Sequence, residues 1–460
     1  MSYLTHPPYD PGVLPEGALW SGVPGGVSPY VQGLMTGSKW GDQDPDSGGV
    51  TALLYYVAED EFLGSGQFSS SWTASELAAA RQAMTRFASV ARLSFAQTSS
   101  EPDSNIVWGS LDDLDSEGSL GFAYPPRLES GDLSGITTVN WEAYEGSSIR
   151  PGSYYFLTFV HELGHALGLK HPHDEEFPYP VFPGVQSRRD GGDGGWNASP
   201  WTVMTYNDLA ANALSPNSLA GGGYLVSLGA YDIAAAQYLY GANESFNQAG
   251  NVYRLDGSLN GYICIWDAGG VDVIAASRSS RRVSIDLRNA TLGTGAGSGG
   301  FVSRVSGVYK GFAIAYNSTG NCIVENAVGS RYGDRITGNA VANVLTGSGG
   351  RDVLTGFGGA DRFVYRALSD SRPGAGRRDV ITDFRSQEGD KIDLSGIDAN
   401  AARGGNQQFV FVGRRQFSGA PGEARYAGNL LQVNVNSDRL ADLEIALTGV
   451  SALSQNQLIL

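Results

Sequence analysis

Three of the five histidines in this chain of 460 residues fall between His161 and His171, in the pattern H-E-x-x-H-x-x-G-x-x-H. On a helix, His161 and His165 lie one turn apart and project from the same face, so both imidazoles can bind one Zn²⁺ at about 2.0–2.1 Å. Gly168 permits the positive φ that ends the helix, after which His171 can turn back as a third ligand. Three protein ligands leave a fourth position for water, which is typical of a catalytic zinc.

Glu162 directly follows the first histidine, where a carboxylate can act as general base toward water at the metal. The alternative is an ordinary amphipathic helix that carries three solvated or core histidines. The complete pattern disfavours this alternative, because each fixed position has a separate task in metal binding or in the turn. Glu162 also favours catalysis over metal binding alone, since holding zinc does not require that carboxylate.

A methionine follows the histidine pattern in the segment T-V-M-T-Y, residues 202–206. The chain contains four methionines, so one in this context is informative. Its soft, apolar thioether would form a floor under the three imidazoles. Taken alone, Met204 would be interpreted as a core residue, and the histidines upstream favour the zinc site.

Between residues 329 and 364 the sequence repeats every nine residues, as GSRYGDRIT, GNAVANVLT, GSGGRDVLT and GFGGADRFV. Glycine opens each unit, aspartate or asparagine holds the sixth place, and an apolar residue holds the eighth. This follows the nonapeptide of the parallel β-roll, in which stacked turns bury the apolar residue. A flexible glycine-rich linker is the alternative, and the constant phase of four units disfavours it.

Aspartates and exposed carbonyls of such turns coordinate Ca²⁺ with hard oxygen ligands at about 2.3–2.6 Å. The candidate calcium ligands in or directly after the repeats are Asp334, Asp352, Asp361, Asp379, Gly347, Gly349, Gly356 and Gly358. Asp383 is an alternative to Asp379 for one further ligand. Only units 347–355 and 356–364 keep glycine at the first and fourth places, so we expect fewer calcium ions than a longer array would hold.

Together, the zinc motif, the V-M-T-Y segment and the nonapeptides resemble the serralysin branch of the metzincins, over roughly residues 34–460. The resemblance implies an α+β fold, with a metzincin-like zinc catalytic domain followed by an all-β parallel β-roll of the RTX type. It implies a secreted zinc endopeptidase that acts on proteins or peptides and is stabilised by calcium. In that family the tyrosine of the Met-turn can ligate zinc and later stabilise the oxyanion. Tyr206 occupies the matching position, and a packed tyrosine is the alternative.

The composition along the chain suggests three segments. Residues 1–33 are rich in proline and glycine and are interpreted as an N-terminal arm or short pro-segment. Residues 34–243 form the catalytic domain, in which residues 154–167 are the zinc helix. Residues 244–460 are the calcium-binding β-roll or β-sandwich domain, ending in the secretion signal that the resemblance implies.

In metzincins an edge strand above the zinc binds the substrate backbone by strand addition. The segment that most resembles this strand is Leu120, Gly121, Phe122, Ala123 and Tyr124. An ordinary interior strand is the alternative.

The chain has 31 basic and 47 acidic residues, a formal net charge of −16, which argues against nucleic acid as a partner. No run of 18 apolar residues predicts a membrane span. The N-terminus lacks the pattern of a Sec signal peptide, which by itself predicts a cytoplasmic protein. The resemblance instead implies type I secretion through an uncleaved C-terminal signal. Residues 443–460 are amphipathic enough for such a signal, and two closing strands are the alternative.

We further expect a monomer with a proteinaceous inhibitor as a partner. Cys264 and Cys322 could form one disulfide or remain two buried thiols, and the sequence leaves this open. Asp190 and Asp193 could hold calcium in the loop after the zinc motif, although a solvated loop is favoured. The competing functional hypothesis is a calcium-binding adhesin or surface protein whose zinc site has lost activity.

Overall fold

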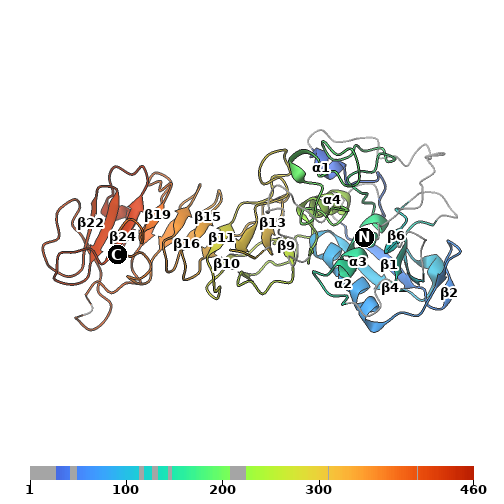
Figure 1. Ribbon diagram of the computed structural model, residues 1–460, viewed down its shortest axis with the longest axis horizontal. Coiled ribbons are helices and arrows are strands. Elements are labelled where there is room, and N and C mark those ends of the chain that lie inside the picture. The colour runs from blue at the N-terminus through green and yellow to red at the C-terminus, as the bar shows by residue number, and fades with distance from the viewer. Residues whose placement is uncertain are drawn as a thin grey trace.

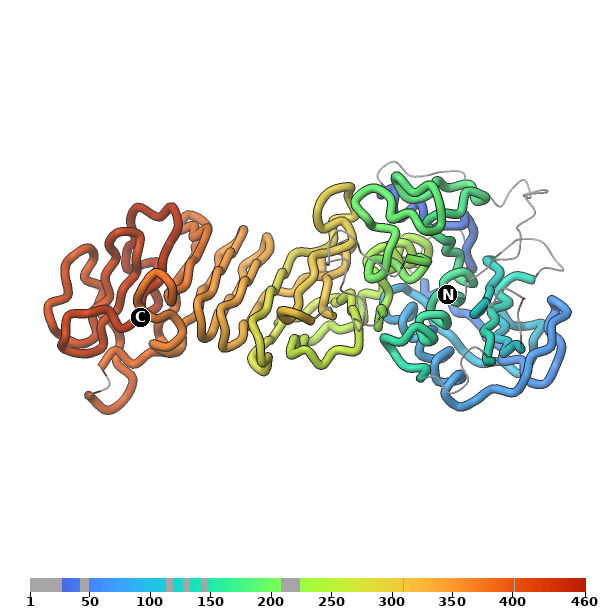
Figure 2. Tube along the Cα trace, viewed as in Figure 1, coloured from blue at the N-terminus to red at the C-terminus, as the bar shows by residue number. Residues whose placement is uncertain are grey.

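The computed structural model describes residues 27–41, 49–112, 119–126, 133–142, 148–207, 224–308, 310–400 and 402–460. The molecule is elongated: the helices and one sheet gather at the N-terminal end, and short strands stack along the rest of its length (Figure 1). Figure 2 traces the same path, in which the chain winds repeatedly around the long axis of the C-terminal part. This arrangement agrees with the α+β class and the β-roll that the sequence predicts.

The N-terminal part is built on a five-stranded sheet with the order β4-β1-β5-β7-β6. Its strands are β1 (Thr51–Val57), β4 (Leu93–Gln97), β5 (Ile106–Leu111), β6 (Gly121–Ala123) and β7 (Ile136–Asn140), and a hairpin of β2 (Glu61–Phe62) and β3 (Phe68–Ser69) lies beside them. All pairs in the larger sheet are parallel except β6 with β7. The strand of interest for substrate binding, β6, is therefore an antiparallel edge strand.

Three longer helices complete this part: α2 (Ala74–Val90), α3 (Tyr154–Ala166) and α4 (Ala230–Tyr240). Helix α2 begins with a capping box in which the Thr73 hydroxyl accepts from Glu76 N and the Glu76 carboxylate accepts from Thr73 N. Single 3-10 turns are η2 (Glu101–Asp103), η4 (Asp193–Gly195) and, at the far end of the chain, η5 (Gln455–Gln457).

The short helix α1 (Pro29–Gln32) belongs to the segment that the sequence assigns to an N-terminal arm. Residues 1–26 of that segment lie outside the described residues. Tyr30 is fully buried, with its ring 5.2 Å from the rings of both Phe182 and Tyr231. Tyr30 and Val31 of this segment are thus part of the packed core of the N-terminal end.

The C-terminal part consists of short strands that alternate between two sheets. They are β8 (Val252–Arg254), β9 (Tyr262–Ile265), β10 (Val273–Ala275), β11 (Val283–Asp286), β12 (Ser303–Val305), β13 (Gly311–Ile314), β14 (Asn326–Val328), β15 (Arg335–Thr337), β16 (Val344–Thr346), β17 (Val353–Thr355), β18 (Arg362–Val364), β19 (Asp379–Ile381), β20 (Lys391–Asp393), β21 (Val410–Phe411), β22 (Glu423–Ala427), β23 (Leu430–Asn434), β24 (Leu443–Leu447) and β25 (Leu458–Ile459).

The repeat units of nine residues produce one strand each. Neighbouring strands in one sheet are two units apart, so Ile336 pairs with Leu354 and Leu345 pairs with Phe363 in parallel. These four eighth-place residues are fully buried between the two sheets. The parallel β-roll predicted from the nonapeptides is therefore confirmed.

The glycine that opens each unit is required by the side chain at the sixth place of the same unit. A Cβ on Gly347 would overlap Asp352 Oδ2, and a Cβ on Gly356 would overlap Asp361 Oδ2. By contrast, a Cβ on Gly349 would find its nearest atom at 3.6 Å, the carbonyl oxygen of Arg331. The first-place glycines thus make room for buried carboxylates.

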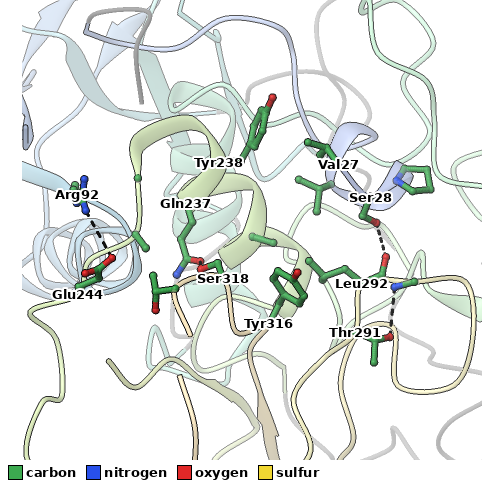
Figure 3. Close-up of a pocket in the computed structure, with 17 residues that line it drawn as sticks. Val27, Ser28, Arg92, Gln237, Tyr238, Glu244, Thr291, Leu292, Tyr316 and Ser318 are labelled. Atoms are coloured by element: carbon green, nitrogen blue, oxygen red, sulfur yellow. Dashed lines mark hydrogen bonds and ion pairs between the residues drawn. The ribbon is translucent and has the colours of Figure 1, made fainter. Parts of the chain in front are cut away.

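The two parts meet around helix α4 and the segment that precedes α1, where a pocket of about 660 Å³ opens between them (Figure 3). Ser28 Oγ donates to Leu292 O at 2.5 Å, and Ser318 Oγ donates to Gln237 Oε1 at 2.7 Å. Both hydrogen bonds join the N-terminal part to loops of the C-terminal part. None of the residues that line this pocket belongs to the histidine motif.

Replacing Gly347 by Ala is expected to destabilise the roll by about 1–3 kcal/mol, because the new methyl group collides with the buried Asp352 carboxylate. Gly349→Ala is the matched control in the same turn and should change stability far less. Chemical unfolding followed by the β signal in circular dichroism measures both. Equal destabilisation by the two variants would contradict the proposed role of the first-place glycine.

Candidate active site

The predicted zinc helix is α3, which begins after Ser153 and ends where Gly168 takes a φ of +96°. The Ser153 side chain accepts from Phe156 N and caps the first turn. At the other end, Leu169 N donates to Gly164 O at 2.9 Å, which reverses the chain. The reversal returns residue 171 toward the helix from which residues 161 and 165 project.

The three histidines of the motif converge in a buried cluster. His161, His165 and His171 are each 3 % exposed or less, and their Nε2 atoms lie 3.1, 3.1 and 3.2 Å apart. A tetrahedral zinc with nitrogen ligands at 2.0–2.1 Å would separate those atoms by about 3.3 Å. The donor set therefore fits one zinc ion.

Each histidine is oriented through its other ring nitrogen. Nδ1 of His161 lies 2.8 Å from Val203 O, and Nδ1 of His165 lies 2.9 Å from Leu169 O. Carbonyl oxygens accept only, so both rings carry the proton on Nδ1 and direct the Nε2 lone pair into the cluster.

The third histidine has a carboxylate partner that the sequence reading missed. Asp174 Oδ2 lies 2.8 Å from His171 Nδ1 and accepts from His171 N at 2.9 Å. Burial opposes the charged form of this carboxyl, but the charge and hydrogen bond of His171 outweigh it and keep the pKa of Asp174 below its ordinary value. The sequence feature that could have indicated this partner is the aspartate three residues after His171.

Glu162 is 1 % exposed, and its Oε1 has no hydrogen-bond partner among the described residues. Burial raises the pKa of its carboxyl well above the ordinary value. The side chain lies against strand β6: a Cβ on Gly121 would be 2.9 Å from Glu162 Cγ and 3.0 Å from Oε1. A buried, unpartnered carboxylate next to a donor cluster fits a group that handles a proton.

Met204 is fully buried and lies against helix α3. A Cβ on Gly164 would be 2.6 Å from its Sδ, so a glycine inside the zinc helix allows the close approach of the thioether. Met204 N donates to Thr202 Oγ1 at 3.0 Å, which tightens the turn.

A second carboxylate that the sequence reading missed fixes this turn from helix α4. Asp232 accepts from Thr202 Oγ1 at 2.5 Å, from Val203 N at 2.7 Å and from Gly229 N at 2.8 Å. Burial raises its pKa to about 7, although these hydrogen bonds oppose the shift. Since Val203 O faces His161, Asp232 supports this histidine through the backbone of one residue.

Tyr206 lies beside the histidines, with its ring centroid 4.5 Å from that of His171 and 6.0 Å from that of His161. Burial, and then the charge of Glu162, raise the pKa of its hydroxyl well above the ordinary value. The phenol is therefore kept protonated and can donate a hydrogen bond. His173 also packs on this group, 5.1 Å from the rings of His171 and Tyr206.

The candidate substrate strand lies at the edge of the sheet. Within the described strands, β6 is last in the order and pairs only with β7. The interior position considered as the alternative is therefore excluded. The flanking backbone of the predicted segment is also tied to β7, since Asn140 N donates to Leu120 O and Tyr124 N donates to Ile136 O.

The candidate calcium ligands of the roll form two series, called ladders below, in which the backbone N–H of one residue donates to the side chain of the next. In one, Asp334 N donates to Asp352 Oδ1 at 2.7 Å, and Asp352 N donates to Asp379 Oδ1 at 2.8 Å. In the other, Asn343 N donates to Asp361 Oδ1, and Asp361 N donates to Asp390 Oδ1, both at 2.9 Å. Asp379 thus continues the first ladder.

Asp390 extends the second ladder and was missed by the sequence reading, because it stands 29 residues after Asp361 instead of the 18 of the repeat. Asp383, the alternative to Asp379, accepts from Gly356 N at 2.9 Å and from Phe357 N at 2.8 Å. It therefore caps a repeat turn from outside the ladders.

Buried carboxylate oxygens without a partner occur along the roll. Oδ2 of Asp352, Asp379 and Asp272 has no hydrogen-bond partner among the described residues. Burial raises the pKa of Asp361 to about 7 and that of Asp272 to about 6, and burial together with mutual repulsion raises the pKa of Asp352. Asp267 and Asp272, which lie ahead of the nonapeptides, were also missed by the sequence reading.

Within the described residues, only two groups of three potential ligands converge within 4.8 Å: the three histidines, and His171 with His173 and Asp174. The roll contains no such group, so a calcium site there would need carbonyl oxygens beside the aspartates. In the loop after the zinc motif, the Asp190 carboxylate accepts from Gln186 N and Gly192 N. These hydrogen bonds give the side chain a role in holding the loop backbone.

Cys264 and Cys322 are both buried free thiols, and burial raises the pKa of each. Among the helices that the structure describes, none has the length and apolar character needed to cross a membrane.

The site and fold define a class of protein: a zinc peptidase whose catalytic part precedes a parallel β-roll. Residues 67–189 match the family model described as Matrixin, and residues 231–460 match Peptidase M10 serralysin C terminal. The chain is 32% identical to Serralysin of Photorhabdus luminescens, over 89% of this chain and 82% of the relative. It is 32% identical to Metalloprotease AprA of Pseudomonas entomophila, over 92% and 87% respectively.

This chain therefore belongs to the serralysin family, and it is a zinc-dependent metalloendopeptidase. A further relative, Serralysin A of Dickeya chrysanthemi, is 36% identical over 76% of this chain and 71% of its own length. The family matches support the peptidase and give no support to the inactive adhesin.

Gly121→Ala is expected to lower kcat/KM for casein by about 10²-fold, because the methyl group would collide with Thr138 O of β7 and with the Glu162 side chain and so shift the carboxylate relative to the strand. Gly64→Ala is the control, since a Cβ there meets no atom closer than 3.7 Å. Thermal unfolding of both variants separates lost activity from lost fold. A folded Gly121→Ala enzyme with full activity would show that Glu162 tolerates displacement.

Proposed function

We propose that His161, His165 and His171 hold the catalytic zinc of this endopeptidase. The observation that carries the assignment is the triangle of Nε2 atoms, 3.1–3.2 Å on each side, whose rings are all oriented from Nδ1. When bound, the zinc supplies Lewis-acid chemistry, polarising the scissile carbonyl and acidifying water. Asp174 is the carboxylate that orients His171 for this task.

Glu162 is the general base in this proposal. Its carboxylate accepts the proton of the attacking water and later delivers it to the leaving amine nitrogen. Burial raises the pKa of its carboxyl, which favours a group that can carry a proton during the reaction. Its contact with Gly121 of β6 supports this role, because β6 is the strand that would hold the substrate.

Tyr206 is proposed as a further zinc ligand in the resting enzyme and as a hydrogen-bond donor to the oxyanion during reaction. A protonated hydroxyl near the cluster suits the second role. Such a donor acts on charge that develops only in the transition state, so it lowers the barrier more than it tightens substrate binding.

Strand β6 is proposed to bind the substrate backbone by strand addition along the edge that β7 leaves unpaired. Main-chain hydrogen bonds would hold an extended segment of a protein or peptide above Glu162. A proteinaceous inhibitor that offers an extended segment would use the same edge. We further propose that the enzyme acts as a monomer.

We propose that calcium ions bind the roll through the two aspartate ladders and the carbonyl oxygens of the glycine turns. Buried carboxylates with raised pKa values, several with an oxygen that lacks a partner, are stabilised when a cation neutralises them. Asp390 and the Asp267–Asp272 pair join the sequence-based candidates.

Extracellular location through type I secretion remains part of the proposal. Residues 443–447 and 458–459 form β24 and β25, which pair in parallel with β19 and β20 of the two sheets of the roll. In the folded roll the backbone of these strands is hydrogen-bonded to neighbouring strands. The secretion system would therefore recognise a C-terminal signal before these strands fold.

Glu162→Gln should retain about one zinc per chain and the native fold while losing about 10²–10⁴-fold in kcat, because only the general base is removed. Metal analysis, circular dichroism and a casein assay give the three readouts. Glu175→Gln removes an exposed carboxylate close to the motif and should leave all three unchanged. Near-normal turnover by Glu162→Gln would refute the assignment of the base.

Replacing Asp352 and Asp361 by Ala should raise the calcium concentration needed to fold the roll, since each ladder loses a ligand. During EGTA titration the β signal should fall before the helix signal of the catalytic part. Asp438→Ala, at an exposed position of the same part, is the control. A roll that keeps its β signal after proven calcium removal would rule out calcium as a folding ligand.

A further inference from the structure

Lys170, the residue before the third histidine, is a buried cation without a task in the mechanism proposed above. Its side chain is fully buried, and its ammonium forms no ion pair with any residue that the structure describes. Nζ instead donates to Asp174 O at 2.7 Å and to Pro180 O at 3.3 Å. Both acceptors belong to residues 172–182, which follow the histidine motif and are called the ligand loop below.

Burying this amine is costly. Burial lowers the pKa of Lys170 to about 8, although the charges of Asp174 and Glu176 oppose the shift. A methionine at this position would fill a similar space with an unbranched apolar side chain and would avoid the cost of burying a charge. What the methionine would lack is the pair of hydrogen bonds to the ligand loop.

These two hydrogen bonds tie together separate segments of the ligand loop. Asp174 lies near the start of the loop and Pro180 near its end, and Nζ contacts the carbonyl oxygens of both. The ends of the loop are joined by Phe182 N, which donates to Pro172 O at 2.9 Å. The ammonium therefore acts as a clamp inside a closed loop, and without it both carbonyl oxygens would lose a charged donor.

The clamped loop carries the carboxylate that orients His171. Asp174 Oδ2 lies 2.8 Å from His171 Nδ1, while the backbone carbonyl of Asp174 accepts from Lys170 Nζ. Asp174 is thus held at its side chain by the histidine and at its backbone by the lysine. A shift of this backbone would move the carboxylate away from the imidazole that it orients.

The backbone of Lys170 supports a second histidine. Lys170 N donates to Leu34 O at 2.8 Å. Leu169 O, on the other side of the same peptide unit, lies 2.9 Å from His165 Nδ1. Lys170 therefore takes part in the supports of two of the three histidines, through its backbone for one and through its ammonium for the other.

We propose that Lys170 is a positioning residue for the zinc ligands, whose ammonium clamps the ligand loop so that Asp174 holds His171 toward the other two imidazoles. This inference rests on the zinc site proposed above. Supports of this kind act through the orientation of a ligand, and their loss costs about 10–100-fold in metal affinity or activity. Since both hydrogen bonds of the ammonium go to the ligand loop, its loss should lower zinc affinity and kcat with little effect on KM.

The test compares the wild-type enzyme with Lys170→Met at saturating calcium. The zinc dissociation constant, measured by competition with a zinc-selective chelator, should rise about 10–100-fold. At saturating zinc, kcat for a fluorogenic peptide should fall while KM stays near the wild-type value. With Co²⁺ in place of zinc, the visible absorption spectrum should change, because it reports the geometry of the ligands.

Two controls separate positioning from a general loosening of the fold. Lys391→Met makes the same change at an exposed position of β20 and should leave zinc affinity and kinetics unchanged. Leu93→Ala removes a buried side chain from β4, at the opposite end of the five-stranded sheet from β6. It should lower the unfolding temperature and leave the Co²⁺ spectrum as it is.

Zinc binding by Lys170→Met as tight as in the wild type, with an unchanged Co²⁺ spectrum, would overturn the proposal. Equal zinc loss in Leu93→Ala would also overturn it, because the metal would then follow overall stability. His171→Ala tests the zinc site separately: an enzyme that keeps its zinc after this change would refute the three-histidine assignment itself. Where Lys170→Met does not fold, Lys170→Gln, which keeps an N–H donor without the charge, provides the same comparison.

Discussion

The catalytic part depends on one constraint: three histidines and a glutamate are buried close together in the chain's core, and the three imidazoles must turn their Nε2 atoms toward one another. Burying a polar atom without a partner is costly, so the surroundings must fix every other polar atom of these side chains. Val203 O, Leu169 O and Asp174 do this for the three rings. The three Nε2 atoms are left to converge, in the arrangement proposed above for the zinc.

The supports of the site reach far along the chain. Asp232, on helix α4, holds the turn that contains Val203 and Met204, and Val203 in turn orients His161. Because Gly121 and Gly164 have no side chain, Glu162 can lie close to β6 and Met204 can lie close to helix α3. The site is therefore assembled from a helix, a turn, an edge strand and a later helix, and its geometry is a property of the whole N-terminal part.

In the roll, as in the histidine cluster, backbone groups orient buried side chains, and these side chains are carboxylates. Glycine at the first place of each unit makes room for an aspartate at the sixth, and backbone N–H groups hold one oxygen of each carboxylate. The other oxygen of Asp352 and of Asp379 has no hydrogen-bond partner among the described residues, and it is left for a cation in the arrangement proposed above.

The sequence by itself determined the local features: the zinc helix, its reversal at Gly168, the phase of the nonapeptides and the burial of their apolar residues. These follow from short-range geometry, in which a helix turn or an 18-residue winding fixes what faces what. Only the tertiary structure revealed Asp232, the edge position of β6 and the continuation of the ladders at Asp390. Those features join residues that are distant in the chain. Periodicity within one segment carries no information on which distant segment will pack against it.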